Sequence, residues 1–180
     1  MPELTSIADL LDGTDPLVEW VIHPMLPRRS CVLLVGDAGA GKSFLAYTLA
    51  MGLATGTTVL GWPTQPASIL YFDQENSFPD CLAYLRKIWH GLGKPSLDLI
   101  RANFHLAHFQ LGHRPTWQLA ATELIHRVHP SLLIFDTATP CCDIQDENDN
   151  AEAARAVGAI RSLQNLTHAE NGRASCRERV

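Results

Sequence analysis

The sequence lacks several features that would have assigned it to a specialised class. No apolar run approaches the roughly 18–20 residues that a membrane-spanning helix needs. The first residues, MPELTSIADLLDGTD, lack the basic start and the long apolar stretch of a signal peptide. The chain has no CxxC pair, and its five cysteines are an odd number, which favours reduced thiols over a disulfide framework or a zinc site. These absences predict a cytoplasmic protein with no membrane partner.

A surplus of positive charge is also missing. The chain has 14 Lys and Arg residues against 19 Asp and Glu residues, a net charge of -5. This balance gives no support for broad polyanion binding, although it does not exclude local contacts to nucleic acid. Hydrophobic residues make up 46% of the chain and charged residues 18%, which is typical of a globular rather than a disordered protein. The 180 residues suffice for one domain with a sizeable core.

Apolar runs of strand length alternate with segments of helical period along the chain. Strands are expected at residues 31–36, 68–73, 103–109 and 131–136. Helices are expected at residues 43–55, 78–91 and 116–128, with a last helix after residue 150. The alternation predicts βαβ units, and the continuously apolar strands predict burial on both faces. The expected fold class is therefore α/β, a three-layer parallel sheet with helices on both faces.

The chain divides into three regions by pattern. Residues 1–27 are an irregular lead-in interrupted by prolines, and residues 28–170 hold the alternating core. Residues 171–180, NGRASCRERV, are basic and have no apolar period. They are expected to be a non-native or frameshifted tail on an incomplete core, and an ordinary solvated terminus is the alternative.

Residues 36–43, GDAGAGKS, fit the phosphate-binding pattern G-x-x-x-x-G-K-[ST] in full, between an expected strand and an expected helix. Glycines let backbone N–H groups approach phosphate oxygens, and the start of the helix adds its positive dipole end. Lys42 should reach the β- and γ-phosphates, and Ser43 should place its hydroxyl on Mg²⁺. The expected ligands are ATP and Mg²⁺, and the alternative is a glycine-rich turn with an exposed lysine. The residues expected to bind the nucleotide are Gly36, Asp37, Ala38, Gly39, Ala40, Gly41, Lys42, Ser43 and Phe44.

Two strand-end carboxylates complete the predicted site. Asp136 ends the apolar run SLLIFD, where an acid can hold the nucleotide-bound Mg²⁺, although a turn or cap aspartate would look the same. Glu75 follows the run ILYFD and could polarise the attacking water. Alternatively, Glu75 belongs to the start of the next helix, where Ser77 and Asp80 form a capping pair. Asp73 is a competing candidate for the role of Glu75.

Other polar clusters favour ordinary explanations. Three histidines, His105, His108 and His113, lie close in sequence, but an apolar strand context favours packed or surface side chains over a metal site. The acidic group of Asp143, Asp146, Glu147 and Asp149 lacks the glycine spacing of a calcium loop and is interpreted as a solvated start of the last helix.

Taken together, these motifs resemble the RecA-like P-loop ATPases, and most nearly the RepA-type plasmid replicative helicases and the AAA-type ATPases of phages and mobile elements. The resemblance covers residues 20–56, 68–76 and 131–160. It implies that Lys42 and Ser43 are the Walker A residues, with Lys42 acting in catalysis, and that Asp136 is the Walker B acid. It further implies that Glu75 activates water, that the protein forms a homo-oligomer (a hexamer in intact relatives), and that hydrolysis is coupled to movement on single-stranded DNA.

The resemblance also marks a departure and leaves alternatives. Relatives continue after the last helix into another core strand and a γ-phosphate sensor, where this chain has residues 171–180, so turnover is expected to depend on those elements. A small-molecule P-loop kinase would need an arginine-rich lid, and the sequence shows none. A GTPase is disfavoured because no [NT]KxD motif occurs. An ATP-binding regulatory protein of the same fold remains an alternative.

Overall fold

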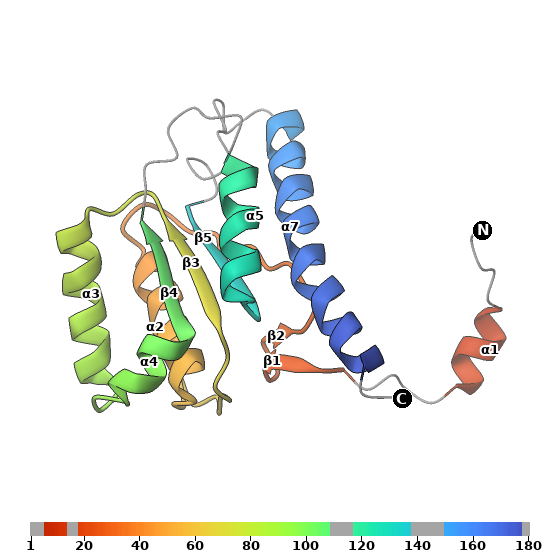
Figure 1. Ribbon diagram of the computed structural model, residues 1–180, viewed down its shortest axis with the longest axis horizontal. Coiled ribbons are helices and arrows are strands. Elements are labelled where there is room, and N and C mark those ends of the chain that lie inside the picture. Colours follow the sequence, from red (N-terminus) through yellow and green to blue (C-terminus); the bar gives the residue numbers. More distant parts are fainter. Residues whose placement is uncertain (1–5, 14–17, 109–116, 138–149, 178–180) are drawn as a thin grey trace.

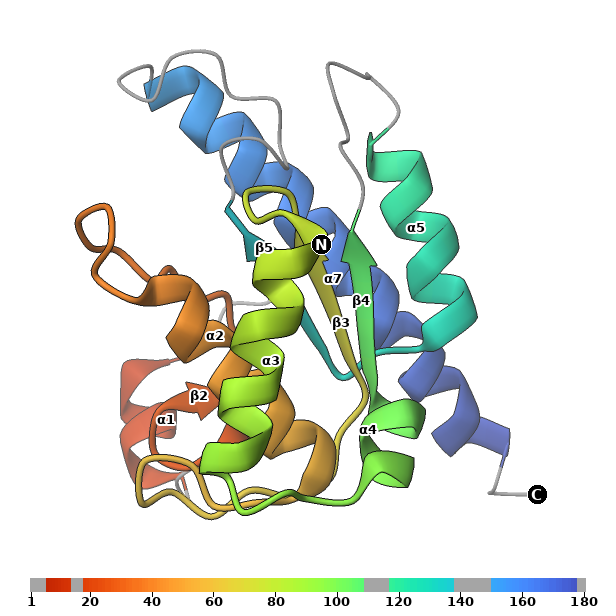
Figure 2. The same ribbon diagram turned by 90° about the vertical axis from the view of Figure 1, so that its left-hand side faces the viewer.

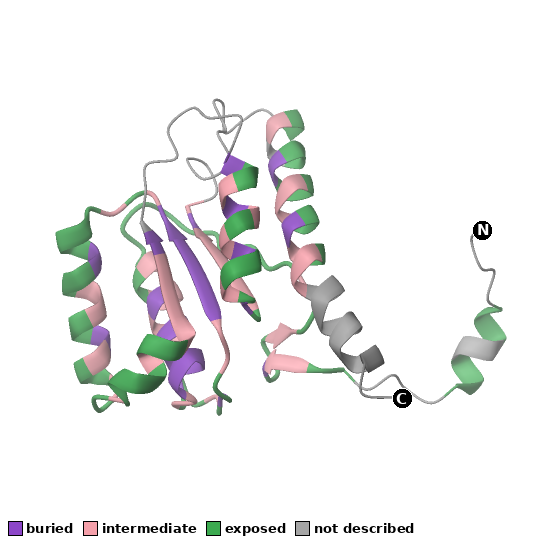
Figure 3. Cartoon of the chain, in the orientation of Figure 1, coloured by how far each residue is buried: buried purple, intermediate pink, exposed green. Residues whose placement is uncertain are grey.

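The centre of the computed structural model, which describes residues 6–13, 18–108, 117–137 and 150–177, is a parallel sheet. Its three strands are β3 (Ile69–Asp73), β4 (Phe104–His108) and β5 (Leu132–Asp136), in the order β4–β3–β5. The middle strand β3 is buried at every residue (Figure 3). The predicted parallel sheet is confirmed, and three of the four expected strands form it.

Helices cover both faces of this sheet, as the alternating pattern predicts. One face carries α2 (Lys42–Thr55), α3 (Phe78–Gly91) and α4 (Leu97–Asn103), and the other carries α5 (Trp117–Val128) and α7 (Asn150–Arg177) (Figures 1 and 2). Successive side chains of β3 alternate between the two cores, because neighbouring residues of a strand point to opposite faces. Tyr71 packs with the α2 and α3 layer, whereas Phe72 packs with the α5 and α7 layer.

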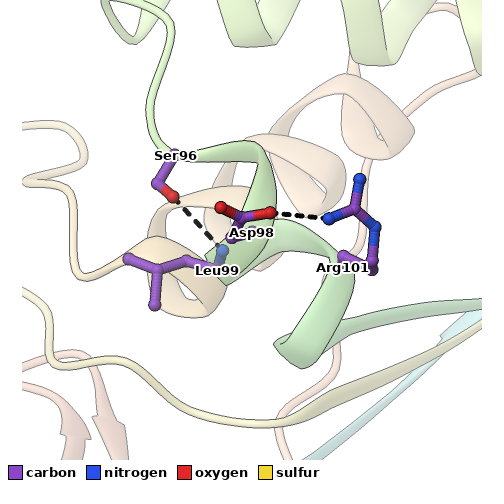
Figure 4. Close-up of polar contacts among 4 residues, drawn as sticks. All are labelled: Ser96, Asp98, Leu99 and Arg101. Carbon is purple, nitrogen blue, oxygen red and sulfur yellow. Dashed lines mark hydrogen bonds and ion pairs between the residues drawn. The ribbon is translucent and has the colours of Figure 1, made fainter.

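The helices begin and end where local signals place them. α2 ends at Thr55, and the following Gly56 adopts the left-handed conformation (φ 69°) favoured just after a helix. α3 has the bounds that the sequence predicts, and the side chain of Ser77 accepts a hydrogen bond from the N–H of Asp80 at its start. α4 was not predicted, because seven residues are too few to show a helical period. Its start is capped by Ser96, which accepts from the N–H of Leu99 (Figure 4).

The lead-in contains regular elements rather than only irregular chain. They are α1 (Ile7–Asp12) and an antiparallel pair formed by β1 (Trp20–Ile22) and β2 (Leu26–Pro27). Ile22 is buried in the core beside α2, so it fastens this pair to the sheet domain. The division at residues 27 and 170 stays a prediction, and α7 continues into the segment 171–180 as far as Arg177.

The strand predicted at residues 31–36 is wrong. These residues have no regular secondary structure and are exposed, with Val35 at 78% and Leu33 at 73%. An apolar run becomes a buried strand only where a neighbouring strand completes its hydrogen-bond ladder, and no strand in the described part of the chain pairs with this run. The residue just before this run, Ser30, does contact α7, because the Gln164 side chain donates to its carbonyl at 3.1 Å.

None of the helices in the described ranges is both long enough and apolar enough to cross a bilayer.

Candidate functional site

The glycine-rich loop is an exposed turn that leads directly into α2. Gly39 and Gly41 have φ values of 76° and 85°, a conformation that L side chains rarely adopt. Nothing lies within 4 Å of a Cβ atom placed on either residue, so backbone conformation rather than crowding requires glycine there. The Lys42 ammonium donates to the carbonyls of Gly36 at 2.7 Å and Asp37 at 2.9 Å. The loop therefore curves around the Lys42 ammonium, and its outer surface is accessible to an anion.

Ser43 and Asp136 meet in the structure although 93 residues separate them in sequence. The Ser43 hydroxyl, in the first turn of α2, donates to Oδ1 of Asp136 at 3.2 Å. Asp136 ends β5 and is 6% exposed. A hydroxyl oxygen and a carboxylate oxygen are the hard donors that Mg²⁺ prefers, and both lie next to a phosphate-binding loop. These two residues therefore fit a magnesium ion that accompanies a nucleotide.

The second oxygen of Asp136 is bound by a buried tyrosine. The Tyr71 hydroxyl donates to Oδ2 of Asp136 at 2.6 Å, and Tyr71 has no exposed surface. Burial and the negative charge of Asp136 raise the pKa of the Tyr71 phenol far above its ordinary value. The hydroxyl therefore keeps its proton and acts as a donor at any ordinary pH.

Asp73 lies opposite Asp136, and its carboxylate oxygens already accept hydrogen bonds from other groups of the protein. Its carboxylate accepts from the Tyr47 hydroxyl, the Cys81 thiol, the side-chain amide of Asn76, and the backbone N–H groups of Glu75 (3.1 Å) and Asn76 (2.9 Å). Burial alone would raise the pKa of Asp73, but the hydrogen bonds from Tyr47 and Asn76 outweigh it and lower the pKa. Asp73 is thus a charged anchor for the turn after β3, which argues against the role of a water-activating base.

Glu75 lies in the turn that Asp73 anchors. Its side chain is exposed, and it stands two residues beyond Asp73, which pairs in register with Asp136. The turn is therefore at the same carboxyl edge of the sheet as Asp136, where ligands bind in open α/β folds. The capping pair of Ser77 and Asp80 is also present, so the two interpretations of this segment are compatible. Its role in activating water stays a prediction.

The other residues considered in the sequence analysis lie elsewhere on the fold or outside the described ranges. Phe44 is 43% exposed and its ring contacts that of Tyr84 edge to face, with centroids 6.2 Å apart. His105 lies on β4, with a ring nitrogen 3.1 Å from the carbonyl of Ala102. The backbone of His108 ends the same strand. His113 and the acidic group at residues 143–149 lie outside the described residues.

A magnesium site here would not be a dense cluster of protein ligands. Among the residues that the structure describes, no group of three or more His, Cys, Asp and Glu side chains could hold a metal ion. Protein sites for Mg²⁺ that accompany a nucleotide commonly use one or two side chains plus phosphate oxygens. The pair of Ser43 and Asp136 matches this small number of protein ligands.

Two buried tyrosines that donate to the strand-end aspartates were not identified from the sequence. Tyr47 stands four residues after Ser43 on α2, and Tyr71 stands two residues before Asp73 on β3. A phenol inside an apolar run is a signal, because a buried hydroxyl needs a partner. The run ILYFD carries that signal, but nothing in it reveals that the partner is on another strand.

A family model described as an AAA domain matches residues 2–170. The matched region includes the glycine-rich loop, both strands that end in an aspartate, and α5. No curated protein matches the chain.

Proposed function

The chain belongs to the AAA domain family, an ATPase family, and on that premise we propose that it is a magnesium-dependent, ATP-binding RecA-like ATPase. The observation that carries this proposal is the contact between Ser43 and Asp136, at 3.2 Å. A strand-end carboxylate and the hydroxyl that follows the loop lysine are brought together at the mouth of the phosphate loop. Such a pair is what P-loop ATPases use to hold the metal of Mg-ATP.

Each residue of the site has a distinct task in this proposal. The N–H groups of the loop and the Lys42 ammonium bind the phosphates. Ser43 and Asp136 hold Mg²⁺, which neutralises phosphate charge when it is bound. Glu75 accepts a proton from a water molecule and orients it, and its exposed position leaves it open to solvent. Asp73 and Asn76 keep the turn that carries Glu75 in one conformation.

We place this ATPase in DNA replication or mobile-element biology, as a helicase-like motor. The resemblance of residues 20–56, 68–76 and 131–160 to RepA-type helicases supports this placement. Single-stranded DNA is the partner proposed, and a homo-oligomer of the hexameric kind that the resemblance implies is the assembly proposed. Light scattering with and without Mg-ATP tests the assembly, and a chain that stays monomeric in both states would contradict it.

Nucleotide binding is tested first with Lys42→Ala. The variant loses the ammonium that contacts the loop, so its affinity for a fluorescent ATP analogue should fall by at least tenfold. Lys87→Ala, which removes an exposed lysine from α3, is the matched control and should bind like the unaltered chain. Unchanged affinity in Lys42→Ala would overturn the assignment of the loop.

Turnover is tested with Glu75→Gln and phosphate release. The variant should bind Mg-ATP normally but lose hydrolysis, because an amide cannot accept the proton of water. Glu123→Gln on α5, on the opposite face of the sheet, is the control. Stimulation of phosphate release by single-stranded DNA supports the DNA-linked function. Binding without turnover would instead indicate a regulatory protein, and a phosphorylated small product would indicate a kinase.

A further inference from the structure

Two tyrosines lie face to face between the phosphate loop helix and the sheet. The rings of Tyr47 and Tyr71 are parallel within 1°, with centroids 4.3 Å apart, and neither residue has exposed surface. Tyr47 comes from α2, one turn after Ser43, and Tyr71 comes from β3. Phe104 of β4 packs on both rings, at 6.5 Å and 6.2 Å. One stacked and one tilted aromatic neighbour leave each ring little freedom to turn.

The two hydroxyls of this pair serve different aspartates. Tyr47 donates to Asp73, whereas Tyr71 donates to Oδ2 of Asp136 at 2.6 Å. Asp73 and Asp136 face each other in register at the ends of β3 and β5. Tyr71 pairs in register with Ile134, so its hydroxyl reaches diagonally across to a residue two positions further along the neighbouring strand.

The two carboxylate oxygens of Asp136 accept from different donors. Oδ2 accepts from Tyr71, and Oδ1 accepts from the Ser43 hydroxyl beside the phosphate loop. A carboxylate held at one oxygen by a fixed donor cannot rotate freely about its Cβ–Cγ bond. Its other oxygen is then kept toward Ser43, and ordering before binding strengthens the binding of a metal because less entropy is lost.

We propose that Tyr71 is a positioning residue for the metal-binding carboxylate, fixing Oδ2 of Asp136 so that Oδ1 stays directed at the magnesium position beside Ser43. Tyr47 has the same chemistry but serves the Asp73 turn instead, and it keeps the Tyr71 ring in place by stacking. This inference rests on the proposed function for the identity of the bound ion. The contact between Tyr71 and Asp136 does not rest on it.

The first test is the Mg²⁺ dependence of nucleotide binding in Tyr71→Phe, which keeps the ring and the stack and removes only the hydroxyl. The Mg²⁺ concentration for half-maximal binding of a fluorescent ATP analogue should rise on the order of tenfold, the equivalent of one hydrogen bond to a charged group. Affinity for the analogue in EDTA should not change. Tyr47→Phe is the matched control, because it loses a buried hydroxyl from the same stack, and its Mg²⁺ dependence should stay that of the unaltered chain.

Three results would overturn the proposal. The Mg²⁺ concentration for half-maximal binding could stay unchanged in Tyr71→Phe, it could fall, or it could shift equally in Tyr71→Phe and Tyr47→Phe. Equal shifts would mean that the stack matters only for packing. A lower Mg²⁺ concentration for half-maximal binding in Tyr71→Phe would mean that the hydroxyl withdraws charge from the carboxylate rather than orienting it.

A second measurement separates this proposal from the proposed function. The melting temperatures of Tyr71→Phe, Asp136→Asn and the double variant form a cycle without nucleotide. The decrease in melting temperature of the double variant should be smaller than the sum of the two single decreases. The decreases caused by Tyr47→Phe and Asp136→Asn should instead be additive. If the unaltered chain binds no Mg-ATP, the proposed function fails, and the cycle alone decides whether Tyr71 positions Asp136. Additive losses for Tyr71 would overturn the positioning role.

Discussion

Asp73 and Asp136 stand opposite each other in register at the ends of two adjacent parallel strands, yet the fold treats them differently. Asp73 has no exposed surface and is surrounded by donors from its own turn, α2 and α3. Asp136 is held by Tyr71 at one oxygen and by Ser43 at the other, at the edge that carries the phosphate loop. Asp73 therefore stabilises its own turn, whereas one oxygen of Asp136 contacts Ser43, the first residue after the loop lysine.

Replacing Asp136 by asparagine should weaken Mg-ATP binding by at least tenfold, while binding of the nucleotide in EDTA stays the same. The amide oxygen can still accept hydrogen bonds, but it lacks the negative charge that Mg²⁺ prefers. Titration of a fluorescent nucleotide at several Mg²⁺ concentrations measures the effect. Asp98→Asn, which breaks an exposed ion pair with Arg101, is the control. Equal Mg²⁺ dependence in all three proteins would remove Asp136 from the metal site.

The Asp73 carboxylate should make stability depend on acid pH. Because the folded state lowers its pKa below the ordinary value of about 4, its stabilisation is complete above that pH and is lost as pH falls through the folded pKa. At pH 7, Asp73→Asn should lower the free energy of unfolding by about 1.5–3 kcal/mol, the worth of hydrogen bonds to a charged group.

Urea unfolding from pH 7 down to pH 3 measures this difference. The gap between the unaltered chain and Asp73→Asn should stay constant above about pH 5 and narrow below about pH 4. The groups that face the carboxylate are the Tyr47 phenol, the Cys81 thiol and the Asn76 amide, none of which changes its charge in this range. A gap that widens on acidification would contradict the assignment of Asp73 as a buried anion.

Gly52→Ala should destabilise the protein by about 1–3 kcal/mol, although alanine is the better helix former. A Cβ atom on Gly52 would lie 1.9 Å from the Val59 side chain, and the carbonyl of Gly52 also accepts from Thr64. Gly158→Ala in α7 is the matched control, because nothing lies within 4 Å of its Cβ position. That variant should gain up to about 1 kcal/mol from helix propensity. Thermal unfolding of both variants measures these effects. A stabilised Gly52→Ala would show that the Val59 side chain can move to make room for the added Cβ atom.

Cys81 should resist alkylation in the folded protein. Burial raises the pKa of its thiol to about 11, so at pH 8 only about a thousandth of it is the reactive thiolate. Cys31 is exposed and should react much faster with iodoacetamide. Peptide mapping by mass spectrometry follows each site, and in urea the two cysteines should react at similar rates. Rapid modification of Cys81 in the folded chain would mean that the Asp73 turn opens readily.

The elements that local sequence predicts well are those with strong local signals. α3 begins after a serine cap and ends at its predicted residue, and the runs that end at Asp73 and Asp136 form strands. The run at residues 31–36 looks equally strand-like but forms none, because a ladder partner is a property of the rest of the fold. α4 is missed for the opposite reason, because a serine cap and an ion pair stabilise a helix too short to show a period.

Local sequence was sufficient to predict the glycine-rich loop and the strand-end position of both aspartates, because turn chemistry and strand period act over a few residues. Tertiary structure decided that Ser43 meets Asp136 across 93 residues. It also decided that Asp73 accepts from donors of its own turn, α2 and α3 while Asp136 accepts from Ser43 and Tyr71, and that each of two stacked tyrosines donates to a different aspartate. These outcomes depend on strand register and on how α2 packs on the sheet, and no local pattern contains either.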